Sequence, residues 1–74
     1  MKEKLNAVDA FAERLKDLME GKSLNIKELS KLVGIPRSTI NGWTLKQRTA
    51  NIESLCVIAD FFGVTTDYLL GREE

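Results

Sequence analysis

The sequence contains no histidine, and it has a single cysteine and a single proline among its 74 residues. One cysteine cannot form an internal disulfide, and without histidine or paired thiolates the common zinc sites are excluded. The lack of histidine also removes the most frequent general base of enzymes. Because no nucleophile and base can be paired, we expect a protein that is not an enzyme and that uses no cofactor or metal.

Long apolar runs are also missing. No stretch approaches the roughly 20 apolar residues that cross a bilayer, and the first four residues are not followed by a signal-type apolar segment. We therefore expect a soluble, cytoplasmic protein with no membrane partner. A chain of 74 residues, of which 43% are apolar, has room for one small core. We expect this domain over residues 8–71, between an N-terminal extension at 1–7 and a tail at 72–74.

Acidic residues are absent from one internal segment, although 11 basic and 11 acidic residues balance over the whole chain. Residues 29–50 contain Lys31, Arg37, Lys46 and Arg48 with no acid, whereas residues 51–74 contain five acids and Arg72, so the two segments carry charges of +4 and −4. This separation suits a docking surface for an anionic partner. Four solvated basic residues are equally compatible with an ordinary surface.

The first half of the chain has the pattern of two helices. The first is amphipathic, with apolar residues at a 3.6-residue spacing, and Gly21 ends it. These residues are Val8, Phe11, Ala12, Leu15, Leu18 and Met19. Asn25 and Glu28 have the spacing of a capping box, which predicts a second helix that runs to Gly34. Its apolar positions are Ile26, Leu29, Leu32 and Val33.

Three further helices are predicted after Gly34. Pro36 suits the first turn of a third helix over residues 36–43, with Ile40 and Trp43 facing inward, and residues 44–50 have the character of a loop. Asn51 caps a fourth helix that Gly63 stops, and Thr65 caps a last one through Leu70. The buried stripe predicted for the fourth helix is Ile52, Leu55, Cys56, Ala59 and Phe62. The expected architecture is a compact all-α bundle of five helices.

The second and third predicted helices have the spacing of a helix-turn-helix unit. Two short helices are joined by a turn at Gly34, and the branched residue Ile40 follows six positions later. The side of the third helix opposite Ile40 carries Arg37, Ser38 and Asn41, which can all form hydrogen bonds. Because an α-helix fits the major groove of B-form DNA and arginine matches guanine O6 and N7, this face is suited to reading DNA.

The segment Leu24–Trp43 resembles the helix-turn-helix of the Cro/CI-type, or XRE, transcriptional regulators. The flanks Phe11–Leu15 and Ile58–Gly71 are similar to other helices of that family, so the resemblance covers nearly the whole chain. It implies a five-helix, lambda-repressor-like domain of a prokaryote or phage. Such a domain binds double-stranded DNA as a two-fold homodimer and regulates transcription, and we expect it to act as a repressor.

Departures from the family pattern alter the expected contacts. Ile26 stands where a glutamine commonly touches a phosphate, so we expect Asn25 or Lys27 to make that contact. Pro36 replaces the usual serine or threonine cap. Thr44 replaces a common glutamate.

Gly42 occupies a position that often reads a base in the family. It has no side chain with which to do so, and it weakens the helix by about 1 kcal/mol relative to alanine. The expected specificity surface is therefore Arg37, Ser38, Thr39 and Asn41.

Each expected contact has a plainer alternative. Arg37 and Asn41 could be ordinary exposed residues, and Ser38 and Thr39 could serve only to stabilise the first turn of the helix. Lys46 and Arg48 lie in the loop after the third helix, where we expect them to meet phosphates. Together with Asn25 and Lys27, these residues complete the predicted DNA-binding set.

Dimerisation is expected through the end of the chain. Phe61, Tyr68 and Leu70 cannot all face one small core, so we predict that they join two chains; the alternative is that they only seal the domain. A different functional alternative is an antitoxin, or a module that keeps the fold but binds protein. The replaced glutamine at Ile26 and the bare position at Gly42 would fit that alternative.

Overall fold

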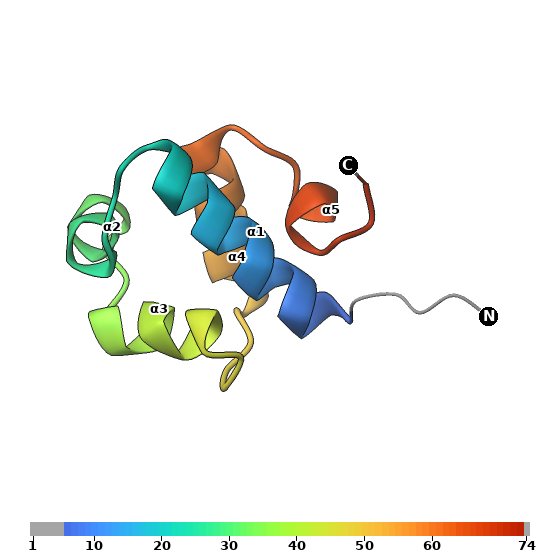
Figure 1. Cartoon of the computed structure of the whole chain (residues 1–74), viewed down its shortest axis with the longest axis horizontal. Helices are drawn as coiled ribbons and strands as arrows, with labels where there is room; N and C mark the ends of the chain where they lie inside the picture. The colour runs from blue at the N-terminus through green and yellow to red at the C-terminus, as the bar shows by residue number, and fades with distance from the viewer. Residues whose placement is uncertain (1–5, 74) are drawn as a thin grey trace.

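The computed structural model describes residues 6–73, which form five α-helices and no strand (Figure 1). The helices are α1 (Ala7–Gly21), α2 (Ile26–Val33), α3 (Arg37–Thr44), α4 (Ile52–Phe62) and α5 (Thr66–Leu69). This arrangement confirms the predicted all-α, five-helix architecture. Three boundaries differ by one residue: Pro36 is the N-cap of α3 rather than its first residue, α3 ends at Thr44 rather than Trp43, and α5 ends at Leu69 rather than Leu70.

Side-chain caps set the residues at which most of these helices begin. Asn6, Asn51 and Thr65 each accept a hydrogen bond from a backbone N–H in the first turn of α1, α4 and α5. At α2 the predicted capping box is confirmed, because the Asn25 side chain accepts from the Glu28 N–H and the Glu28 carboxylate accepts from the Asn25 N–H. These bonds satisfy amides that a helix leaves unpaired at its start.

Trp43 of α3 lies in the centre of the hydrophobic core. Its side chain is 1% exposed, and its ring meets the Phe11 ring of α1 edge-on, with the ring centroids 5.3 Å apart. Ile40 is fully buried beside it, as predicted. The other buried members of the core are Leu15, Met19, Leu29, Ile58, Ala59 and Leu69. Because α1 packs on both α3 and α5 and crosses the middle of the molecule in Figure 1, it holds the two together.

Two residues assigned to the buried stripe of α4 are exposed. Ile52 is 82% exposed and Cys56 is also exposed, whereas Ile58, which the prediction omitted, is fully buried. The prediction was wrong because apolar residues occur on nearly every side of this helix, so its periodicity does not identify one face. Packing against the core selects the side of α4 that carries Ile58 and Ala59.

The apolar positions predicted for α2 also divide in two. Leu29 is fully buried and Leu32 is 58% exposed, while Ile26 and Val33 are half-buried. A two-turn helix that packs mainly on α3 has one narrow inward side, and Leu29 occupies it. Leu32 therefore belongs to the surface rather than to the core.

The folded unit extends into both predicted terminal segments. Asn6 caps α1 and Ala7 is its first residue, so this part of the predicted extension 1–7 belongs to the domain. Residues 1–5 of the extension lie outside the described residues, as does Glu74 of the predicted tail. In that tail, the Arg72 N–H donates to the Asp67 carbonyl oxygen at 2.8 Å and closes the turn after α5.

We expect Trp43→Ala to lose a large part of the stability of the fold. The substitution removes the largest of the fully buried side chains, and aromatic-to-alanine changes in a core cost about 3–5 kcal/mol. A chain of this length has a total stability of about 4–11 kcal/mol. Urea unfolding followed by circular dichroism measures the loss. Ile52→Ala is the control and should stay within about 0.5 kcal/mol of the unmodified protein; an equal loss at both positions would contradict the assigned core.

Candidate nucleic-acid interface

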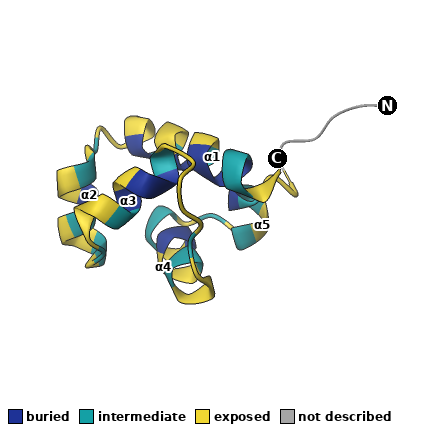
Figure 2. Ribbon diagram, turned by 90° about the horizontal axis from the view of Figure 1, so that it is seen from below, coloured by how far each residue is buried: buried dark blue, intermediate teal, exposed yellow. Residues whose placement is uncertain are grey.

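The turn between α2 and α3 is held by two hydrogen bonds. Gly34 adopts the left-handed conformation predicted for it, with φ of 74°, and its N–H donates to the Ser30 carbonyl oxygen at 2.8 Å. The Ser30 hydroxyl donates to the Ile35 carbonyl oxygen at 2.6 Å. This role of Ser30 was not predicted from the sequence, since a serine inside a helix carries no signal for a hydrogen bond across a turn. The turn brings α2 and α3 side by side (Figure 2).

The outer face of α3 carries the polar residues predicted to lie there. Arg37, Ser38 and Asn41 are exposed, on the side of the helix away from the buried Ile40 and Trp43. The predicted exposure of these three side chains is confirmed, and their contacts with DNA stay predictions. A helix held by its apolar side in this way presents hydrogen-bonding groups outward without disturbing its packing.

Two neighbours complete this face. Thr39 is half-buried, so it lies at the border of the exposed surface. Leu45, the C-cap of α3, is 55% exposed and follows Ser38 by two helical turns, which places it on the same side. Leu45 was not predicted to belong to this surface, because residues 44–50 have no periodicity and have the character of a loop. An apolar side chain here is suited to contact a thymine methyl group.

The start of α2 contributes to the same surface. Ile26 and Lys27 line one shallow depression together with Arg37, Ser38 and Asn41 of α3. The structure therefore brings Lys27, predicted to meet a phosphate, next to the predicted base-reading residues. The depression combines two positive charges with polar side chains, a combination that suits a polyanion.

Asn25 stands beside this depression at the N-cap of α2. It is exposed, and its side-chain oxygen is used in the cap, at 2.8 Å from the Glu28 amide nitrogen. The cap uses only that oxygen, so the NH₂ of the Asn25 side chain can still donate a hydrogen bond. The positive end of the α2 dipole lies at the same place and favours an anion.

After α3 the chain turns back sharply on itself. The Gln47 N–H donates to the Gly42 carbonyl oxygen at 2.8 Å and the Lys46 N–H to the Trp43 carbonyl oxygen at 3.1 Å, which is the Schellman pattern. Lys46 takes the left-handed position of this motif, with φ of 64°. This conformation costs an L-residue about 1–2 kcal/mol and usually selects glycine.

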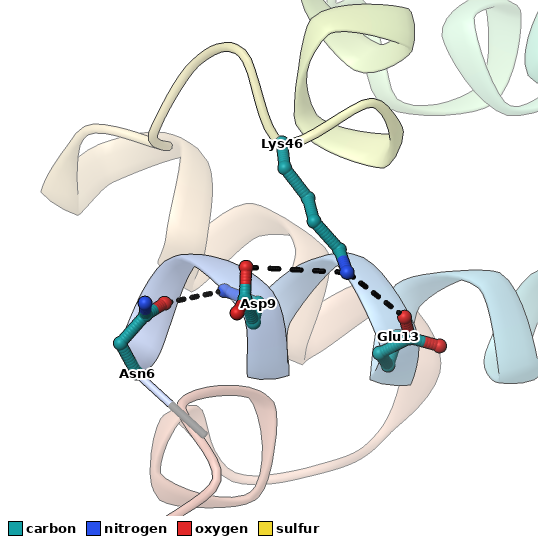
Figure 3. A network of polar contacts seen from close by, with 4 residues as sticks. All are labelled: Asn6, Asp9, Glu13 and Lys46. Carbon is teal, nitrogen blue, oxygen red and sulfur yellow. Dashed lines mark hydrogen bonds and ion pairs between the residues drawn. The ribbon is translucent and has the colours of Figure 1, made fainter. Parts of the chain in front are cut away.

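The Lys46 side chain reaches down onto α1 (Figure 3). Its Nζ lies 3.2 Å from Oε2 of Glu13 and 4.0 Å from Oδ1 of Asp9. All three side chains are partly exposed, so the pairs contribute little to stability. They do direct the Lys46 charge toward α1, which the prediction of a phosphate contact did not anticipate.

Arg48 lies across the backbone of α3 at Gly42. A methyl group at position 42 would stand 2.8 Å from Cδ and 2.9 Å from Cγ of Arg48. Gly42 is consequently buried even though it belongs to the outer part of α3, while Arg48 itself is exposed. From the sequence, position 42 was expected to present no side chain on this surface. In the structure, the Arg48 side chain covers that position.

The three residues predicted to join two chains are half-buried. Phe61 and Tyr68 pack partly against the core, the Phe61 ring meets the Phe62 ring edge-on at 4.9 Å, and the Arg14 guanidinium lies 4.3 Å from the centre of the Tyr68 ring. Leu70 lines a small apolar cavity with residues of α1 and α4. All three residues thus use part of their surface inside the domain and leave part of it exposed.

Two further findings concern residues 6–73 as a whole. No helix in this part of the chain is long and apolar enough to cross a membrane. The same residues contain no group of three or more cysteine, aspartate or glutamate side chains placed to hold a metal ion.

This fold defines a helical DNA-binding class, and comparison with known proteins agrees with it. The helix-turn-helix family model matches residues 15–69, which is more than half of the chain. The protein belongs to this family, in its XRE type, whose members bind DNA and regulate transcription. This assignment confirms the predicted resemblance.

Several curated relatives carry the same description. The HTH-type transcriptional regulator AnsR of Bacillus subtilis (strain 168) is 37% identical over 62 residues, which are 84% of this chain and 53% of AnsR. The HTH-type transcriptional activator BcrR of Enterococcus faecalis is 39% identical over 64 residues, covering 86% of this chain and 31% of BcrR. The chain thus spans about half of the first relative and about a third of the second.

A third relative is more distant. The uncharacterized HTH-type transcriptional regulator YobD of Bacillus subtilis (strain 168) is 26% identical over 61 residues, which are 82% of this chain and 54% of YobD. No solved structure matches the chain. AnsR and YobD are named as transcriptional regulators and BcrR as a transcriptional activator, in agreement with the family match.

Proposed function

We propose that this protein is a sequence-specific repressor that binds duplex DNA as a two-fold dimer, with α3 in the major groove. One observation carries the proposal: Arg37, Ser38 and Asn41 are exposed on α3 while Ile40 and Trp43 anchor its other side in the core. The width of the major groove admits an α-helix held in this manner. A chromosomal DNA target implies a cytoplasmic location.

In this proposal the polar residues divide into base-reading and backbone-contacting groups. Arg37 pairs with guanine O6 and N7, and Asn41 pairs with adenine N6 and N7. Ser38 and the half-buried Thr39 add single hydrogen bonds at the groove edge. The residues proposed to contact phosphates are Asn25, Lys27 and Lys46.

Repression is the simplest regulatory outcome of such binding. A dimer seated in the major groove of a promoter blocks other proteins from that segment, and this needs no surface beyond the DNA-binding one. Activation requires an additional contact with the transcription machinery. The relative BcrR is named an activator, so we assign repression to this chain on the physical argument alone.

Titration against duplex DNA at two salt concentrations tests the proposed function. The duplex is first selected from a random pool, which also returns the sequence and symmetry of the preferred site. We expect the logarithm of the binding constant to fall with the logarithm of salt concentration, with a slope of about −0.9 per phosphate neutralised. If the protein has no affinity for DNA, the alternative of a protein-binding module, such as an antitoxin, replaces this proposal.

Arg37→Ala should relax the preference at one base pair. We expect it to cost about 1–3 kcal/mol on the preferred duplex and much less on a random duplex, because only the preferred site offers a matched base edge. Fluorescence anisotropy on both duplexes measures the difference. Lys27→Ala, at the exposed lysine that lines the same depression, is the matched control and should weaken binding to both duplexes alike. Equal losses on both duplexes for Arg37→Ala would make it a phosphate contact only.

The dimer is proposed to form through the exposed parts of Phe61, Tyr68 and Leu70. A single domain has few base-reading residues, and two copies on half-sites about 34 Å apart double the contacts. Val57 lies one turn before Phe61 on the same side of α4 and is 36% exposed. The apolar surface at this end of the molecule therefore continues along α4.

A charge introduced at Val57 should separate the two chains. We expect Val57→Glu to sediment as a monomer that keeps its helical circular dichroism spectrum, since burial of an unpaired charge between two chains is costly and the position is exposed in one chain. Leu32→Glu makes the same change at an exposed apolar residue of α2 and should remain dimeric. A Val57→Glu protein that stays dimeric would contradict this interface.

A further inference from the structure

Position 42 belongs to the proposed reading surface of α3 but has no side chain. It follows Ser38 by one helical turn, so the two positions lie on the same side of the helix, and Asn41 precedes it directly. Ser38 and Asn41 are exposed, whereas Gly42 is buried. The difference arises because the Arg48 side chain covers Gly42.

The contact between Gly42 and Arg48 leaves no room for a larger residue. A Cβ atom on residue 42 would lie 2.8 Å from Cδ, 2.9 Å from Cγ and 3.3 Å from Nε of Arg48. The first two distances are shorter than carbon atoms tolerate. The aliphatic stem of Arg48 therefore rests directly on the α3 backbone, and its guanidinium begins where a side chain of residue 42 would begin.

Backbone hydrogen bonds and one ion pair hold the loop that carries Arg48 in this place. The N–H groups of Gln47 and Arg48 both donate to the Gly42 carbonyl oxygen, at 2.8 and 3.2 Å. Lys46, whose left-handed conformation makes this return possible, is paired with Glu13 of α1 at 3.2 Å. The loop that carries Arg48 is thus attached to α3 by hydrogen bonds and to α1 by an ion pair.

We propose that Arg48 reads a base in the major groove and that Gly42 is the positioning residue that makes this possible. The inference rests on the proposed function of α3. A guanidinium whose side-chain stem lies over Gly42, on the side of the helix that also carries Ser38, can donate two parallel hydrogen bonds to guanine O6 and N7. Arg48 thereby takes the place of the side chain that residue 42 lacks. This role differs from the phosphate contact expected from the sequence.

A double-mutant cycle of Gly42→Ala and Arg48→Ala tests the pair. Affinities are measured on the selected duplex, on duplexes with single base-pair changes, and on a random duplex. We expect Arg48→Ala to lose about tenfold on the selected duplex and to lose its preference at one base pair. Gly42→Ala should lose preference at that same base pair by displacing Arg48. The double variant should bind no more weakly than Arg48→Ala alone.

Arg48→Lys is a second test of Arg48 that can be read even if the Gly42→Ala protein does not fold. Arg48 is exposed, and lysine keeps the charge but lacks the planar fork, so this variant should bind random DNA like the unmodified protein and lose the preference at the same base pair. Circular dichroism melting confirms that each variant is folded.

Three outcomes would overturn the inference. Equal losses for Arg48→Ala on selected and random duplexes would make Arg48 a phosphate contact. A full effect of Gly42→Ala in the Arg48→Ala background would show that position 42 acts on its own. In both cases the unmodified protein still binds DNA with sequence preference, so the proposed function survives. If the unmodified protein fails to bind any DNA, the proposed function and this inference fall together.

Discussion

The packing of Trp43 against Phe11 sets the rotation of α3 about its own axis, and the functional surface follows from that rotation. Trp43 is 1% exposed and Ile40 is fully buried, so the inner side of the helix has only one favourable orientation in the core. With these two residues held inward, the helical repeat places Arg37, Ser38 and Asn41 outward. Hydrophobic burial, a non-directional force, therefore decides which hydrogen-bonding groups face a partner.

Both ends of α3 are fixed by backbone conformations that glycine usually provides, but only one of them has a glycine. Gly34 turns the chain from α2 into α3 with φ of 74° at little cost. After α3 the corresponding residue is Lys46, with φ of 64°, and its side chain pairs with Glu13 of α1. Backbone hydrogen bonds from Gln47 and Arg48 to the Gly42 carbonyl oxygen bring the Arg48 side chain onto Gly42.

The basic residues that lie close together in the sequence do not all lie on one surface of the folded protein. Residues 29–50 carry four basic residues and no acid, yet Lys46 is turned toward the acids of α1. Lys27, from outside that block, lies instead beside Arg37 at the shallow depression between α2 and α3. The positive surface therefore combines Lys27 of α2 with Arg37 of α3, and the block of basic residues in the sequence does not by itself predict it.

The sequence by itself determined the local features: the Asn25–Glu28 capping box, the turn at Gly34, and the inward side of α3 with Ile40 and Trp43. Each depends on residues within one turn of one another, whose spacing is legible in the chain. Only the tertiary structure decided which side of α4 is buried, where the Lys46 charge points, and that Arg48 covers Gly42. On α4 the apolar residues surround the helix, so its neighbours select the face. The direction of the Lys46 charge and the contact of Arg48 with Gly42 depend on where the loop after α3 packs against α1 and α3. Residue spacing does not encode such contacts between side chains and a folded backbone.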